Sequence, residues 1–142
     1  MYKRQISYNA LMEKIASLLV EKGITPTKQR LELAGLIFNK NQHFTASNLL
    51  SKVEEAGFDI SQATVYNTLW LFEERGMLKT IDMHNECKFY DTNLSAHHHI
   101  YNTESNTITD ISNSEIEFSK LPDIPNSLEV EQTEVLIKVK PK

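Results

Sequence analysis

The sequence predicts an α+β protein that has a winged helix-turn-helix DNA-binding domain over residues 1–91 and a small α/β dimerisation domain over residues 92–142. Up to Gly76, apolar residues recur at helical spacing, and short runs rich in β-branched and aromatic residues follow. With 142 residues, of which 40% are hydrophobic, the chain can form one ordinary domain or two small ones. Three consecutive histidines at positions 97–99 mark the second domain as a place for ligand binding.

Four helices are expected before Gly76. The first covers residues 8–20, and Gly23 follows it as a C-cap. The second begins with Thr25 as N-cap and Pro26 in its first turn, and its apolar positions continue to residue 38. Thr45 caps the third helix, which runs to residue 57, and residue 61 caps the fourth, which ends before Gly76.

The third and fourth helices are separated only by residues 57–60, which is the arrangement of a helix-turn-helix. Residues 61–75 are then the recognition helix, whose early polar side chains can contact base edges or phosphates. A polar first turn is also usual for any surface helix, so spacing alone leaves both interpretations open. The predicted DNA contacts, including two cations of the second helix, are Lys28, Arg30, Ser61, Gln62, Thr64, Tyr66 and Asn67.

Two short runs after Gly76, residues 78–83 and 88–91, predict a β-hairpin that would form the wing. Residues 84–86 form its turn, and we expect structural roles for His84 and Cys87. Three further strands are expected at residues 97–102, 107–111 and 128–139. So small a sheet buries little by itself, which favours a homodimer and therefore a pseudo-palindromic operator in double-stranded DNA.

The histidine row predicts a metal site. In a strand, successive side chains point to opposite faces, so His97 and His99 share one face, about 7 Å apart at Cα, and His98 lies on the other. Carboxylates stand nearby in the sequence at Asp91 and Asp110. Imidazole with carboxylate suits Fe(II), Mn(II) or Zn(II), and imidazole is also an axial ligand of haem iron. The alternative is a polar, solvated strand end.

Composition bounds the remaining function classes. Residues 1–80 contain ten Lys and Arg against eight Asp and Glu, whereas residues 81–142 contain five against eleven, so a nucleic-acid face belongs to the first half. Cys87 is the only cysteine, which excludes an internal disulfide and a structural zinc site built from four cysteines. No apolar run approaches the roughly 20 residues of a membrane span, so we expect a cytoplasmic protein without membrane contact.

Four motifs, TPTKQR at 25–30, HFTA at 43–46, ISQATVYNTL at 60–69 and FYD at 89–91, precede the histidine row. In this order they resemble the ferric uptake regulator superfamily, and ATVY at 63–66 is among the most specific local signatures of that superfamily. The resemblance implies a regulatory site that joins the two domains and fixes the angle between them. Its metal ligands would be His43, Asp91, His97, His99 and Asp110.

The segment after the histidines departs from the superfamily pattern, because residues 100–105 lack the usual C-x-x-C zinc motif. With the triple histidine and the short ending over residues 121–139, the chain looks most like the iron response regulator subfamily. That resemblance implies an iron- and haem-responsive repressor of iron-dependent and haem-biosynthesis genes. Ala96 replaces a histidine of the second regulatory site, and the candidates for haem or that site are His97, His98, His99 and Glu117.

Three alternatives stay open. Peroxide-sensing or Mn/Fe-sensing repressors of the same superfamily would have similar ligands. A cupin-type dioxygenase could use His97, His99 and Glu104, but its barrel needs glycines around that motif, and all four glycines lie at or before Gly76. We therefore predict that the chain is not an enzyme. A winged helix that binds only protein would have no salt-dependent DNA affinity.

Overall fold

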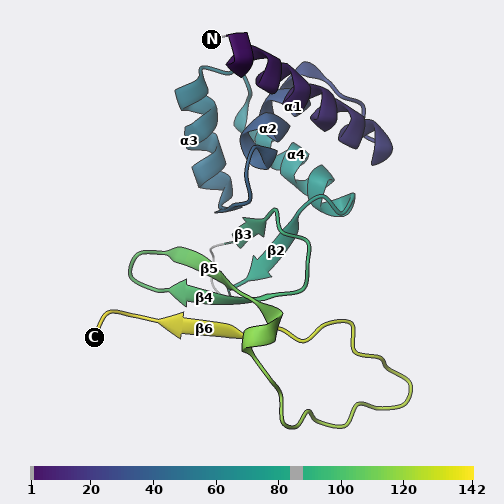
Figure 1. Cartoon of the computed structure of the whole chain (residues 1–142), viewed down its shortest axis with the longest axis vertical. Coiled ribbons are helices and arrows are strands. Elements are labelled where there is room, and N and C mark those ends of the chain that lie inside the picture. The colour runs from purple at the N-terminus through teal and green to yellow at the C-terminus, as the bar shows by residue number, and fades with distance from the viewer. Residues whose placement is uncertain (1, 84–87) are drawn as a thin grey trace. The chain divides into compact units, whose positions relative to one another are not determined.

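The computed structural model describes residues 2–83 and 88–142, which form two compact units that divide after Leu94 (Figure 1). The predicted domain boundary lies slightly earlier, after Asp91. The N-terminal unit contains the helices and a small sheet, and the C-terminal unit contains a second sheet. None of the helices in the described ranges is both long and apolar enough to cross a membrane.

Four helices form the N-terminal unit: α1 (Tyr2–Glu21), α2 (Lys28–Phe38), α3 (Ala46–Ala56) and α4 (Gln62–Glu74). All four were predicted, and α1 starts earlier than the expected residue 8. The predicted N-cap of α2 is wrong by two residues. Thr27, not Thr25, accepts the backbone N–H of Arg30 on its side-chain oxygen, and the carbonyl of Thr25 instead accepts the Arg30 guanidinium at 2.9 Å.

The caps of α3 and α4 agree with prediction. Thr45 and Asn48 form a reciprocal capping box at the start of α3, and Gly57 ends that helix in the left-handed conformation, with φ of 70°. Ser61 caps α4 by accepting the backbone N–H of Thr64. The connection between α3 and α4 is therefore short and defined at both ends, as a helix-turn-helix requires.

The wing contains one more strand than predicted. The hairpin strands β2 (Lys79–Asp82) and β3 (Lys88–Asp91) pair antiparallel, and β1 (His43–Phe44) joins the other edge of β3, so the order is β1-β3-β2. The pairing sets His43 opposite Asp91. The predicted turn at residues 84–86, with His84, and also Cys87 lie outside the described residues.

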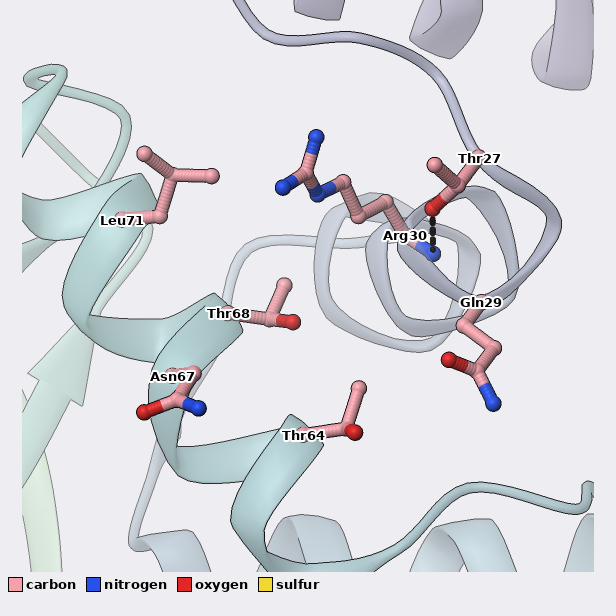
Figure 2. Close-up of a pocket in the computed structure, with 7 residues that line it drawn as sticks. All are labelled: Thr27, Gln29, Arg30, Thr64, Asn67, Thr68 and Leu71. Atoms are coloured by element: carbon pink, nitrogen blue, oxygen red, sulfur yellow. Dashed lines mark hydrogen bonds between the residues drawn. The ribbon is translucent and has the colours of Figure 1, made fainter.

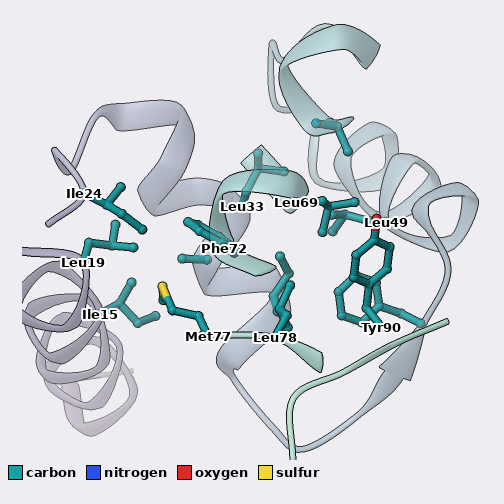
Figure 3. Packing of buried hydrophobic residues seen from close by; sticks show 14 of the residues in the cluster. Ile15, Leu19, Ile24, Leu33, Leu49, Leu69, Phe72, Met77, Leu78 and Tyr90 are labelled. Atoms are coloured by element: carbon teal, nitrogen blue, oxygen red, sulfur yellow. The ribbon is translucent and has the colours of Figure 1, made fainter. Parts of the chain in front are cut away.

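One apolar core joins the helices to the wing (Figure 3). Leu33, Leu69 and Phe72 are fully buried between the helices, and Leu49 packs from α3. Tyr90 enters the same core from β3 and stacks on the Phe44 ring with centroids 5.4 Å apart. The short strand β1 is thus held by packing as well as by its backbone pairing.

The C-terminal unit is a three-stranded sheet in the order β5-β4-β6, with β4 (His98–Asn102), β5 (Thr107–Ile111) and β6 (Leu136–Val139). β4 pairs antiparallel with β5 and parallel with β6. Over residues 95–142, all of which are described, the helical content is the single 3-10 turn η1 (Asn113–Glu115), so the predicted α/β character is limited to that turn. The predicted third strand, 128–139, is too long, because the strand pairing with β4 covers only residues 136–139. A long connection precedes β6 (Figure 1).

Candidate metal centre and nucleic-acid interface

The N-terminal unit brings together two of the predicted metal ligands. His43 in β1 lies opposite Asp91 in β3, and its Nε2 is 3.2 Å from the Asp91 Oδ2. Asp91 is buried, and its Oδ1 accepts the backbone N–H of Asn93 at 2.9 Å, which fixes the carboxylate on its own turn. An imidazole and a carboxylate are thus held in contact by the backbone pairing of two strands.

The C-terminal unit brings together the other three predicted ligands. Asp110 in β5 pairs across the sheet with His99 in β4. Its Oδ1 lies 3.1 Å from the Nε2 of His97 and 3.5 Å from the Nε2 of His99. Each of these three residues offers a ligand atom within 4.8 Å of the other two. As predicted from strand alternation, His97 and His99 converge, with ring centroids 4.5 Å apart.

The hydrogen bond at the far side of the His97 ring indicates what this cluster can hold. Nδ1 lies 2.6 Å from the backbone oxygen of Ser95, and because a carbonyl only accepts, Nδ1 must donate. In the neutral ring, Nε2 then carries a lone pair that faces the Asp110 carboxylate oxygen. Two electron pairs in contact require a cation between them, which is either a proton or a metal ion. Histidines that bind a metal commonly donate their other ring N–H to a carbonyl in this way.

The donor set fits a divalent transition metal. Both half-sets consist of imidazole nitrogens and carboxylate oxygens, which suit Fe(II), Mn(II) and Zn(II). The C-terminal set contains two imidazoles and one carboxylate, and the N-terminal set contains one of each. Asp110 keeps 39% of its side chain exposed, so an ion can approach the C-terminal set from solvent.

His98 points elsewhere, as strand alternation predicts. The ring is buried, its Nδ1 accepts the backbone N–H of Val135 at 2.9 Å, and Phe118 packs edge-on against it. An Nδ1 that accepts leaves the proton on Nε2, so neither nitrogen offers an available electron pair to iron in this arrangement. The other second-site candidate, Glu117, is exposed. The geometry therefore gives His98 a structural role between β4 and the segment before β6.

The predicted DNA-contacting residues occupy the exposed side of α4 and the start of α2. Val65, Thr68, Leu69 and Phe72 are buried, while Gln62, Tyr66 and Asn67 are exposed on α4. Ser61 uses its hydroxyl as the cap, where it also contacts the Thr64 hydroxyl at 2.9 Å. Lys28 is exposed. Ser61 and Thr64 thus shape the start of the helix as much as they offer contacts.

A polar pocket of about 350 Å³ separates the start of α2 from α4 (Figure 2). The α2 side contributes Thr27, Gln29 and Arg30, and the α4 side contributes Thr64 and Asn67 together with Thr68 and Leu71. Gln29 is tied to the α3–α4 connection, since its Nε2 donates to the carbonyl of Asp59 at 3.0 Å. Hydroxyls, amides and one guanidinium around a hollow suit a phosphate group.

Sequence reasoning missed Trp70. It is the only tryptophan of the chain and is 62% exposed on α4, one turn after Tyr66, which is 47% exposed. The signal was available, because residues four apart lie on the same face of a helix. An exposed aromatic pair on the polar side of this helix extends the candidate interface beyond the first turn.

Comparison with known proteins identifies the family. Residues 21–139 match the ferric uptake regulator family. A ferric uptake regulation protein of Campylobacter upsaliensis is 32% identical over 100 residues, which cover 69% of this chain and 64% of that protein, just under two thirds of its length. The peroxide-responsive repressor PerR of Staphylococcus aureus is 31% identical over 100 residues, 70% of this chain and 67% of that protein.

Solved structures agree. The ferric uptake regulator of Francisella tularensis with iron has a TM-score of 0.68 at 25% identity, covering 84% of this chain and 93% of that one. The Pseudomonas aeruginosa ferric uptake regulator with manganese shares the fold, with a TM-score of 0.68 at 21% identity and coverage of 90% and 98%. With a family match that spans most of its length, the chain belongs to the ferric uptake regulator family.

Proposed function

We propose that this protein is a metal-sensing transcriptional regulator that binds operator DNA through α4 and responds to Fe(II), Mn(II) or Zn(II). The observation that carries the proposal is the contact of His97 and His99 with Asp110, in which Nδ1 donation leaves the Nε2 of His97 facing a carboxylate oxygen. A bound metal ion would replace a proton there and satisfy all three ligands.

We further propose that one ion takes ligands from both units, with His43 and Asp91 completing the set. The proposal rests on the resemblance of the sequence motifs and on the fact that each half-set is already assembled within its own unit. Such an ion would favour one arrangement of the DNA-binding and C-terminal units and so change DNA affinity by shifting a population. In this proposal the protein binds the metal ion and DNA reversibly and catalyses no reaction.

DNA binding by α4 is supported by the helix-turn-helix geometry and by the polar, exposed residues of that helix. The pocket between α2 and α4 would seat a backbone phosphate beside Arg30. A homodimer would present two copies of α4 to a pseudo-palindromic operator. Such a role requires access to chromosomal DNA, which agrees with the predicted cytoplasmic location.

The finer prediction of a haem response finds less support than a metal response. His98 would have to give up the hydrogen bond from Val135 before either ring nitrogen could bind haem iron. His97 and His99 are engaged with Asp110. Sensing of iron or of peroxide through bound metal uses the same ligands, and the relatives include both ferric uptake regulation proteins and peroxide-responsive repressors.

The test begins by selecting duplexes from a random DNA library with the full-length protein, once with Mn(II) and once with chelator. We expect an enriched motif with dyad symmetry. DNA affinity is then measured with Mn(II), with chelator and with haem, for the wild type and for His97→Ala/His99→Ala. Coupling between two ligands typically changes affinity by about 5- to 150-fold, and the double variant should lose this response.

Glu104→Gln is the matched control, because it removes an exposed carboxylate of the same unit that has no part in the cluster. It should respond as the wild type does. A DNA response to haem that survives chelation would replace the metal proposal with the haem-responsive one. No enriched motif under either condition would remove DNA binding altogether.

A further inference from the structure

The side chain of Gln42, the residue before His43, is bonded to two helices. Its Nε2 donates to two backbone carbonyls in the last turn of α2, those of Leu36 at 3.0 Å and Ile37 at 2.7 Å. Its Oε1 accepts from the Lys52 Nζ of α3 at 2.6 Å. A single amide therefore joins the end of one helix to the side of the next, and it satisfies carbonyls that a helix end otherwise leaves unpaired.

The backbone of the same residue is bonded to the end of β3. The N–H of Gln42 donates to the Thr92 Oγ1 at 2.9 Å, and the N–H of Thr92 donates to the Gln42 carbonyl at 3.2 Å. These bonds continue the β1–β3 pairing one residue beyond His43 and Asp91. The position of His43 relative to Asp91 therefore depends on where Gln42 is held.

Lys52 is the residue of α3 that donates a hydrogen bond to the Gln42 amide. Partial burial lowers the pKa of Lys52, and the positive charge of Lys40 lowers it further. Because burial removes water from the ammonium group, the hydrogen bond to the Gln42 Oε1 stabilises its charged form. The same helix packs into the core through Leu49 and Val53, which are buried. A displacement of Gln42 would therefore act on α3, and through the short connection at residues 57–60 on the start of α4.

We propose that Gln42 is a positioning residue that orients His43 toward Asp91 and links metal binding by this pair to the helix-turn-helix. The inference deepens the proposed metal response and rests on it. The chain of contacts runs from the two ligands through the Gln42 backbone to its side chain, and from there to α2 and α3. All of these residues belong to the N-terminal unit.

The test compares the wild type with Gln42→Leu, which keeps the backbone bonds and the approximate volume but removes the amide. Mn(II) affinity is measured by electron paramagnetic resonance, and DNA affinity is measured with and without Mn(II) on the selected duplex. Loss of a residue that orients a metal ligand typically weakens metal affinity by about 10- to 100-fold. We expect Gln42→Leu to fall in that range and to retain about a third or less of the wild-type Mn(II) effect on DNA affinity.

A second readout needs no DNA. Mn(II) should slow amide hydrogen exchange in α3 of the wild type, and this slowing should be lost in Gln42→Leu. The slowing of exchange by Mn(II) should also be smaller in Lys52→Met than in the wild type. If the amide and the ammonium act as one contact, Lys52→Met should add nothing in the Gln42→Leu background, which a double-mutant cycle measures.

Thr45→Ala is the matched control. It removes the N-cap of α3 and should lower the melting temperature, but it leaves the side-chain and backbone hydrogen bonds of Gln42 in place. If Thr45→Ala loses the Mn(II) effects to the same extent as Gln42→Leu, the role of Gln42 is only structural and the proposal is overturned. If Mn(II) does not change the DNA affinity of the wild type, both the proposed function and this inference are overturned. If Mn(II) changes the DNA affinity of the wild type and of Gln42→Leu to the same extent, only the inference about Gln42 is overturned.

Discussion

At the scale of single residues, three consecutive histidines have two different environments because a strand alternates its side chains. His97 and His99 meet Asp110 on one side, and His98 accepts a backbone N–H from Val135 on the other. The alternation could be predicted from the sequence, since it follows from strand geometry alone. The partner of His98 could not, because Val135 is 37 positions away and its backbone carries no sequence signal.

The two environments predict opposite effects of similar substitutions. His99→Ala should weaken Mn(II) binding by about 100-fold or more, because it removes one of few protein ligands. His98→Ala should leave Mn(II) affinity within a few-fold of wild type but should lower the free energy of unfolding by about 1–3 kcal/mol, since it leaves a backbone donor without its acceptor. Titration with Mn(II) and denaturant unfolding separate the two. Equal losses of Mn(II) affinity would make His98 a ligand after all.

Asp110 offers a test of charge rather than of shape. Asp110→Asn preserves the size of the side chain but replaces the anionic oxygen that faces His97 and His99. We expect Mn(II) affinity to fall by about 10- to 100-fold, because a neutral amide oxygen stabilises a dication less than a carboxylate does. Isothermal titration with Mn(II) measures the change. Unaltered affinity would place the ion elsewhere.

At the scale of elements, a feature could be predicted when the residues that determine it lie within one helical turn of one another in the sequence. The caps Thr45 and Ser61 and the end of the third helix at Gly57 are local features, and all three agree with the structure. The strand β1 was missed because its two residues pair with β3, which is distant in sequence. Thr25 and Thr27 are equally good N-caps by residue type, so only the path of the chain decides between them.

Substitution by alanine should destabilise the protein to different extents at Gly23 and at Gly57. Gly57 and Gly23 both have a left-handed backbone, with φ of 70° and 74°, which costs a residue with a Cβ about 1–2 kcal/mol. At Gly57 an added Cβ meets nothing within 4 Å, whereas at Gly23 it would lie 2.8 Å from the Arg75 Nη1. That guanidinium donates to the carbonyls of Lys22 and Gly23. We therefore expect Gly23→Ala to lower the free energy of unfolding more than Gly57→Ala does, as chemical denaturation would measure.

The exposed face of α4 predicts a split between specific and non-specific DNA binding. Tyr66→Ala should weaken binding to the selected duplex by about 1–3 kcal/mol, with a smaller loss on unrelated DNA, because base contacts carry sequence information and phosphate contacts do not. Trp70 is the only tryptophan, so its fluorescence reports each titration without a label. Equal losses on both duplexes would remove Tyr66 from base recognition. Unchanged Trp70 emission on binding would place the DNA away from this part of α4.

At the scale of the whole molecule, the main question is whether one ion joins the two compact units. Each half-set of ligands is explained within its own unit, by β1–β3 pairing in one case and by β4–β5 pairing in the other. The resemblance of the sequence motifs implies which five residues take part, and that ligand set stays a prediction. Whether the two half-sets act on one ion depends on the equilibrium between arrangements of the units, which no local pattern encodes.

Proteolysis between the units tests this directly. The units divide after Leu94, whose side chain is 44% exposed, so subtilisin should cleave this connection in the chelated protein. If one ion holds both units, Mn(II) at about 100 times its dissociation constant should reduce the open population and slow cleavage by up to about 100-fold. Mass spectrometry identifies the cut. His43→Ala and His99→Ala should each abolish the protection, although they belong to different units. Protection that survives His43→Ala would mean that the C-terminal ligands bind the ion without the N-terminal pair, and metal would then act on DNA affinity by another route.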